Sequence, residues 1–220
     1  MSIVLLGSTS GSCTLQEQAV AGTTTLTLPT TSGTVALTSQ LPTAPSAVGQ
    51  ILFSTDGSTY TPTAKIVSGT AVSLATGSPT SVDFSSIPSW VKRITIMLAG
   101  VSSNSTSLIQ VQLGDAGGIE TTGYLSTAQN AGASANSTTG YLLTQTNPAV
   151  ASLTGNSFLC KIDGNTWILN GDTAQQPTVS ASVSSLGGSK TLSDTLTTVR
   201  LTTVNGTDTF DAGTVNIFYE

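Results

Sequence analysis

Short stretches in which apolar and hydroxyl-bearing residues alternate recur along most of this chain. The alternation is clearest in residues 200–204 and 214–219, and a more continuous apolar run at 94–99 is typical of a strand covered on both faces. Glycine, proline, asparagine or aspartate closes these stretches, and none has the spacing of a helical apolar face. The pattern therefore predicts an all-β protein.

Strand candidates follow one another closely from about Lys65 to the last residue. About eight to eleven short strands in about 155 residues favour two packed sheets. We therefore expect a jelly-roll-like β-sandwich over residues 64–220. The candidates are 66–74, 82–84, 92–101, 108–113, 123–126, 141–144, 157–162, 166–169, 178–183, 197–204 and 214–219. Expected turns between them include 163–165, 170–172, 187–189 and 205–208.

The first 63 residues differ from this domain and divide into two parts. Residues 1–40 hold short strand templates with too little apolar surface to fold alone, because a small core cannot offset the entropy of ordering the chain. They predict an extended β arm that becomes ordered by adding strands to another protein. Residues 41–63 contain three prolines and form a connector, in which Asp56 and Gly57 predict a hairpin between 50–54 and 56–60.

Three segments resemble bacteriophage fibre-like and virion structural proteins. The first combines Gly-Ser-Thr-Ser-Gly-Ser at 7–12, Thr-Leu-Gln at 14–16, Ala-Gly-Thr at 21–23, Thr-Leu-Thr-Leu-Pro at 25–29 and Gly-Thr-Val at 33–35. The second runs from the Ile-Pro-Ser-Trp-Val-Lys-Arg junction at 87–93 through 113–120, and the third is the ending at 206–220. The resemblance implies that residues 1–40 anchor the protein to other virion proteins, and that the chain forms a homotrimer with a projecting β domain.

Charge restricts the partners of this protein. Charged residues make up 8% of the chain, far below the usual quarter, and the net charge is −5. The six basic residues are scattered, so we expect no nucleic-acid partner.

The first residues lack the basic and long apolar regions of a signal peptide, and no window is apolar enough for a membrane helix. We therefore expect synthesis in the host cytoplasm without membrane insertion. A place in the virion is what the resemblance to fibre-like proteins implies.

Catalytic chemistry finds little support in the sequence. The chain has no histidine, which excludes the Ser-His-Asp and Cys-His arrangements. Two carboxylate pairs, Asp115 with Glu120 and Asp208 with Asp211, lie beside glycines, where turn formation is the favoured interpretation. Segment 114–120 also offers oxygen ligands for calcium, although without the spacing of an EF-hand loop. We expect no enzyme, no catalytic residue, no cofactor and no metal.

A binding surface is the stronger hypothesis, and it centres on the polar stretch 129–138. Tyr124 and Tyr141 flank this stretch, and an exposed aromatic ring with neighbouring amides is typical of sugar-binding surfaces. A polar loop held on a rigid sandwich is a common place for such a site. The candidate residues are Tyr124, Gln129, Asn130, Asn136 and Tyr141. The alternative, which we favour for the two tyrosines, is that both rings pack at the rim of a sheet.

These observations together predict a non-enzymatic virion structural protein. It would be a short fibre or spike, anchored by its N-terminal residues, whose distal β domain attaches to a glycan on the host surface. The main alternative is a capsid decoration, cement or head-fibre protein that stabilises the shell. A secreted carbohydrate-binding module would need a signal peptide, and a small glycosidase would need a carboxylate pair in a cleft.

Overall fold

The computed structural model describes residues 3–6, 12–15, 50–54, 60–64, 66–176 and 181–220. Every regular element in these ranges is a β-strand, and every strand pairing is antiparallel. The predicted all-β class is therefore confirmed for the described part of the chain. Residues 1–2, 7–11, 16–49, 55–59, 65 and 177–180 lie outside it.

Two hairpins precede the main domain in the sequence. Strand β1 (Ile3–Leu6) pairs with β2 (Ser12–Leu15), and β3 (Gln50–Ser54) pairs with β4 (Tyr60–Ala64). The hairpin predicted around Asp56 and Gly57 is present, but its second strand begins at Tyr60, which pairs with Ser54. The turn itself and most of the predicted arm lie outside the described residues.

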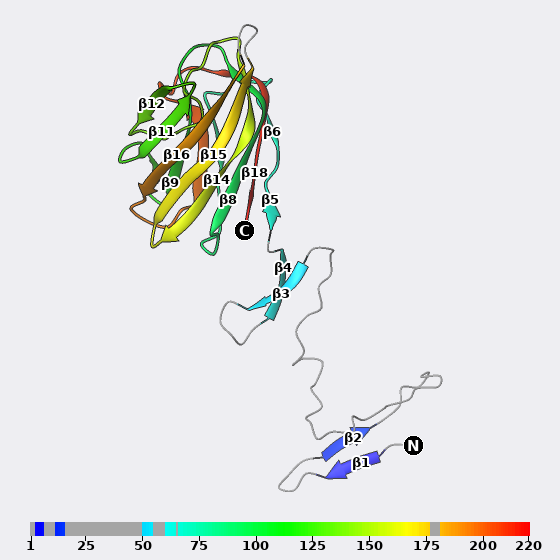
Figure 1. Ribbon diagram of the computed structural model, residues 1–220. Helices are drawn as coiled ribbons and strands as arrows, with labels where there is room; N and C mark the ends of the chain where they lie inside the picture. The colour runs from blue at the N-terminus through cyan, green and yellow to red at the C-terminus, as the bar shows by residue number, and fades with distance from the viewer. Residues whose placement is uncertain (1–2, 7–11, 16–49, 55–59, 65, 177–180) are drawn as a thin grey trace.

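The larger sheet of the main domain has the strand order β12-β11-β16-β15-β14-β8-β18-β5, and β6 also pairs with β18 (Figure 1). The C-terminal strand thus lies inside this sheet, between β8 and the short strands β5 and β6. The bounds are β5 (Val67–Ser68), β6 (Val72–Ser73), β8 (Arg93–Ser103), β11 (Leu125–Asn130), β12 (Ala133–Ser137), β14 (Ser152–Asp163), β15 (Thr166–Gln176), β16 (Ser182–Thr191) and β18 (Phe210–Tyr219).

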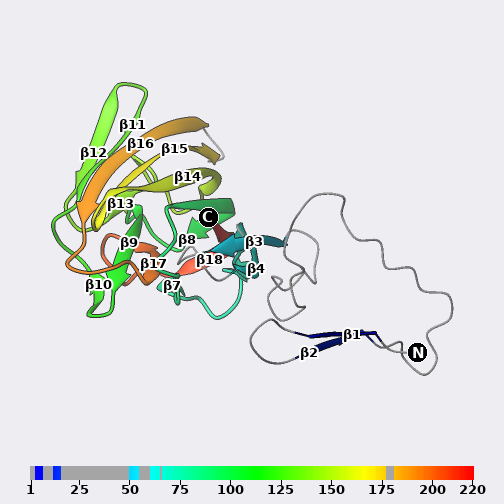
Figure 2. The same ribbon diagram turned by 90° about the horizontal axis from the view of Figure 1, so that it is seen from below.

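The smaller sheet has the order β10-β9-β17-β7, and β13 pairs with the same side of β9 as β10 does. Figure 2 shows the two sheets as separate layers, one containing β14, β15 and β16 and the other containing β7, β9 and β17. The bounds are β7 (Ser81–Phe84), β9 (Ile109–Asp115), β10 (Gly118–Glu120), β13 (Tyr141–Leu142) and β17 (Thr198–Thr203).

One hydrophobic core fills the space between the two layers. Alternate residues of β8 (Ile94, Ile96 and Leu98) and of β9 are buried in the same cluster as Val199 and Leu201 of β17. Burying such a side chain contributes about 1.5–3 kcal/mol. Two antiparallel sheets around one core are consistent with the β-sandwich that the short alternating strands predicted.

Two predicted turns are wrong, because both lie inside long strands. Residues 170–172 belong to β15 and residues 187–189 belong to β16. In the first, Gly171 pairs with Ser157 of β14, and a Cβ atom at Gly171 would lie 2.6 Å from the carbonyl oxygen of Asn156. Glycine there allows close approach of two backbones and does not mark a chain reversal.

Candidate functional site

Tyr124 and Tyr141 are completely buried between the sheets. Their rings meet edge to face, with centroids 5.1 Å apart. The hypothesis that they form exposed platforms for a sugar is therefore wrong, because neither ring has a solvent-accessible face. The alternative expectation placed both rings at the rim of a sheet. The rings do pack against the fold, but they lie in its core cluster and not at a rim.

The two phenol groups also complete the hydrogen bonding of the interior. The Tyr124 hydroxyl accepts a bond from the Leu113 N–H at 2.7 Å and donates to the Glu120 carbonyl at 3.0 Å. The Tyr141 hydroxyl donates to the Trp167 carbonyl at 2.7 Å. Burial raises the pKa of both phenols, so they stay neutral donors. These tyrosines join β9 and β15 from the inside.

The polar stretch 129–138 is a strand hairpin and not the predicted loop. Strands β11 and β12 pair with each other, and β11 also pairs with β16. Ala131 and Gly132 between them both have positive φ, which suits a tight two-residue turn. Gln129 and Asn136 are exposed and Asn130 is half-buried, so the polar members of the predicted site do share one exposed hairpin.

A groove of about 510 Å³ runs along the outer face of the larger sheet beside this hairpin. Its floor is at Gly187 of β16, which pairs with Thr127, and Thr127 pairs with Asn136 in turn. A Cβ atom at Gly187 would have no neighbour within 4 Å, so the missing side chain leaves open space. We call it the β16 groove; its lining is Leu125, Ser126, Thr127, Asn136, Ser137, Thr138, Gly187, Gly188 and Ser189.

The β16 groove combines fixed polar groups with one apolar side chain. The Thr127 hydroxyl donates to Asn136 Oδ1 at 2.8 Å, which orients both side chains. Leu125 is 72% exposed, an unusual state for leucine. None of the described residues that line the groove is ionisable. Such a lining suits a neutral ligand that has both hydroxyl groups and C–H faces.

Of the predicted residues, Asn136 alone lines the β16 groove, and Gln129 and Asn130 lie further along the same hairpin. The sequence prediction missed Leu125, Thr127 and Gly187. A signal for Gly187 was present, because adjacent glycines within a strand pattern can mark a surface where another molecule approaches closely.

Asp115 and Glu120 come together as a structural cluster. Asp115 accepts bonds from the Ser193 hydroxyl at 2.6 Å and from the N–H groups of Asp194 and Gly117 at 2.9 and 2.8 Å. Glu120 forms an ion pair with Lys190 and accepts from the Ser193 N–H at 2.7 Å. These carboxylates already have protein donors, and the described residues contain no group of three or more potential metal ligands.

The same contacts set the acidity of this cluster. The Ser193 hydroxyl is the largest cause of the lowered pKa of Asp115. Desolvation is the largest single influence on Glu120 and acts upward, but the bonds from Lys190 and Ser193 together leave its pKa lowered. Both groups are therefore held ionised by the contacts that fix residues 114–120 against 190–194.

Asp208 lies in a loop, whereas Asp211 lies in strand β18. Asp208 accepts bonds from the Ser107 N–H at 3.1 Å and the Asn205 amide at 2.7 Å, whereas Asp211 accepts from the Ser102 hydroxyl. The turn interpretation fits Asp208 and is wrong for Asp211, which bonds across from β18 to β8.

Comparison with known proteins gives no assignment, since no protein-family model, curated protein or solved structure matches the chain. Within the described ranges, no helix has the length and apolar character needed to cross a membrane.

Proposed function

We propose that this protein is a non-enzymatic bacteriophage virion structural protein, a short fibre or spike that attaches to a neutral glycan on the host surface. The observation that carries the binding role is the uncharged β16 groove, in which Gly187 leaves space beside Leu125, Thr127 and Asn136. The placement in a virion is supported by the resemblance of segments 7–35, 87–120 and 206–220 to fibre-like proteins. Residues 1–40 anchor the chain to other virion proteins.

In this proposal the main domain is jelly-roll-like and the protein acts as a homotrimer. The low charge, with a net value of −5 in 220 residues, leaves little repulsion between identical subunits. A fibre with three copies of a weak site binds a surface far more tightly than one copy does, because later contacts form at high effective concentration. Light scattering on the purified full chain measures this state, and a monomeric mass at micromolar concentration contradicts it.

Gly187→Val tests the binding role. A valine side chain extends into the β16 groove from its floor, and its Cβ atom would meet no atom within 4 Å. We expect loss of binding to immobilised neutral saccharides with little change in melting temperature. Asn156→Val is the matched control, because Asn156 is exposed on the same sheet and does not line the groove. Unchanged saccharide binding by Gly187→Val contradicts the proposed site.

Electron cryomicroscopy of purified particles tests the virion assignment. Density for the β domain projecting from a tail or spike supports the fibre proposal, and absence of the protein from particles contradicts it. Density attached to the head, either flat on the shell or projecting from it, supports the second candidate, a decoration or head-fibre protein.

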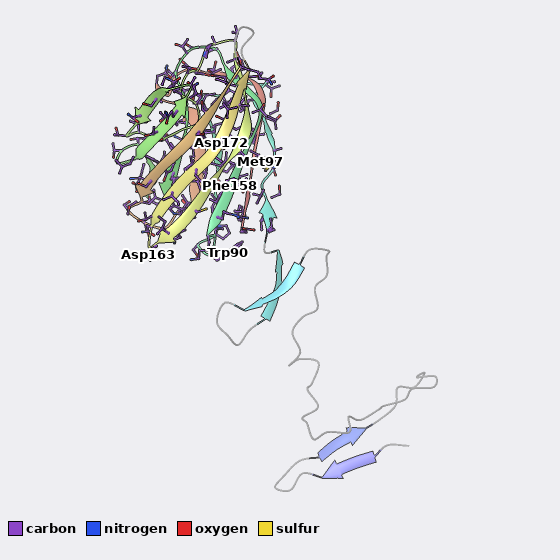
Figure 3. All side chains as sticks on the ribbon, viewed as in Figure 1. Trp90, Met97, Phe158, Asp163 and Asp172 are labelled. Atoms are coloured by element: carbon purple, nitrogen blue, oxygen red, sulfur yellow. The ribbon has the colours of Figure 1, made fainter. Side chains whose placement is uncertain are left out.

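One surface favours that second candidate. Met97 and Phe158 lie on the outer face of the larger sheet (Figure 3), and both are half-buried. Phe158 and Phe218 flank Thr95 on either side in the strand register. A broad sheet face with apolar side chains suits contact with a capsid subunit. Phe158→Ser distinguishes the candidates, because it lowers occupancy on heads in the decoration case and leaves fibre incorporation unchanged.

A further inference from the structure

The outer face of the smaller sheet carries a second polar surface, remote in sequence from the hairpin at 125–137. Two rows of polar residues cross three strands there. Asp83 of β7, Arg200 of β17 and Gln112 of β9 form one row in the strand register. Ser81, Thr202 and Gln110 form the next row. Since cross-strand neighbours on one face lie about 5 Å apart, the six side chains form a compact polar array.

This array lies in a recess of the protein surface. Gln110, Gln112 and Thr202 are 1%, 7% and 5% exposed, although their side chains lie on the face opposite to the core. They contribute to a groove of about 410 Å³, whose rim includes Thr121 and Thr139. This volume lies within the range of small-molecule sites, about 300–1,000 Å³. We call it the β17 groove.

Hydrogen bonds within the β17 groove fix its floor. Gln110 Oε1 accepts from the Thr139 hydroxyl at 3.2 Å, and Gln112 Nε2 donates to the Thr139 carbonyl at 2.9 Å. The Thr202 hydroxyl donates to the Thr80 carbonyl at 2.9 Å. Gln112 Oε1 has no hydrogen-bond partner among the described residues. A rigid acceptor at the floor of a groove is a recognition element. A ligand donor can bind it without the entropy cost of fixing a flexible side chain.

The charges in this region balance. Arg200 donates from Nε and Nη2 to the two carboxylate oxygens of Asp83, each at 2.7 Å. The bonds from Asp83 raise the pKa of Arg200, which stays a cation. Because a guanidinium has five N–H donors, further donors remain for a ligand. The ion pair as a whole is neutral, which favours a neutral ligand over an anion.

From this arrangement we infer that the β17 groove is a second binding site, and that its ligand is a neutral saccharide of one or two residues. Donors from Arg200 and the acceptor of Gln112 occupy one row of the strand register, so a donor and an acceptor are available to two hydroxyl groups of the same sugar. No aromatic ring is present among the described lining residues, so binding depends on hydrogen bonds and is weak at each copy. The inference does not depend on the β16 groove or on the virion assignment.

The experiment follows the side-chain amide signals of Gln110 and Gln112 by NMR in the full chain. The probes are glucose, galactose, mannose and N-acetylglucosamine at up to about 50 mM, because such sites have dissociation constants of about 1–10 mM. Inorganic phosphate and N-acetylneuraminic acid serve as anionic probes. We expect at least one neutral sugar to shift both amides, with a smaller effect from either anion.

Two variants identify the contacts. Gln112→Met removes the amide and raises the dissociation constant by about 10-fold or more, the effect of one lost hydrogen bond to a buried group. Arg200→Gln weakens binding without abolishing it, and provides the test if Gln112→Met does not fold. Gly187→Val is the control, because it fills the β16 groove and leaves these shifts unchanged even if the proposed function fails.

Two results overturn the inference. In one, none of the four sugars shifts the Gln110 and Gln112 signals. In the other, phosphate or N-acetylneuraminic acid binds more tightly than every neutral sugar and Arg200→Gln alone abolishes binding, which identifies an anion site.

Discussion

Lys190 is a nearly buried cation whose ammonium group has two partners inside the protein. It forms an ion pair with Glu120, and its Nζ lies 5.3 Å from the centre of the Tyr124 ring. Removing a charge from water is costly, so a buried lysine needs both a counter-ion and further stabilising contacts. Tyr124 and Glu120 supply them, which explains why the tyrosine is structural and not a surface platform.

Tyr124→Phe and Tyr141→Phe each remove a hydroxyl that completes a buried hydrogen bond. We expect each to lower the free energy of unfolding by about 1–3 kcal/mol, the effect of leaving a buried backbone group without a partner. Tyr219→Phe is the control, because Tyr219 is only half-buried and its hydroxyl makes no hydrogen bond among the described residues. Denaturant melts measure the three variants; equal stability of all three contradicts the structural role.

The lowered pKa values of Asp115 and Glu120 predict acid sensitivity. A group whose pKa is lower in the folded state stabilises the fold fully above its ordinary value, here 3.8 for Asp115 and 4.5 for Glu120. This stabilisation decreases as the pH falls toward the lowered values and is absent below them. Denaturant midpoints between pH 7 and pH 2.5 should therefore fall mainly below about pH 4.5.

The double variant Asp115→Asn, Glu120→Gln isolates this contribution. It should be less stable than the parent at pH 7, because Lys190 loses its counter-ion, and the two proteins should converge at low pH. Parallel pH profiles for the variant and the parent contradict the assignment.

At the scale of elements, the pair β14–β15 depends on two glycines that face the opposite backbone. A Cβ atom at Gly155 would lie 2.5 Å from the Asp172 carbonyl oxygen, and one at Gly171 would lie 2.7 Å from the Ser157 Cα. Both glycines also have strongly positive φ, 155° and 154°. Two long strands can therefore stay paired where other residues would separate them.

Gly171→Ala should destabilise the protein by about 2–4 kcal/mol, since it combines an unfavourable backbone conformation with a clash against β14. Gly187→Ala is the matched control in the neighbouring strand, because its added Cβ meets nothing within 4 Å. We expect the control to lie within about 0.5 kcal/mol of the parent. Thermal melts of both variants measure the difference, and equal melting temperatures contradict the close approach.

Local pattern predicted some elements well and could not predict others. The alternation at 200–204 and 214–219 correctly predicted β17 and β18, because one face of each strand packs on the core. The sequence pattern alone predicts turns at Gly171 and Gly187, since it does not show which distant backbone lies beside them. For the same reason, the polar residues next to Tyr124 and Tyr141 in the sequence do not show whether the two rings are buried. The groups that cover them, Lys190 and Trp167, are far away in the chain.

At the scale of the whole molecule, the last strand of the chain completes the larger sheet. Strand β18 pairs with β8 along most of its length and with β5 and β6 on its other side. Its Val215 and Ile217 side chains are buried in the shared core. The sheet is therefore complete only when β18 has paired with a strand about 115 residues earlier in the chain, and such long-range pairings are typical of slowly folding proteins.

Deletion of residues 214–220 should prevent cooperative folding of the entire sandwich. It removes Val215 and Ile217, worth about 1.5–3 kcal/mol each in buried area, and leaves the hydrogen-bonding edge of β8 unpaired. This loss approaches the whole stability of a domain, about 5–15 kcal/mol. Glu220→Gln is the control, because it removes only the half-exposed ion pair with Arg93 and should change stability by less than about 1 kcal/mol. Circular dichroism melts compare the variants, and a truncated protein with the parent's melting temperature contradicts an essential role for β18.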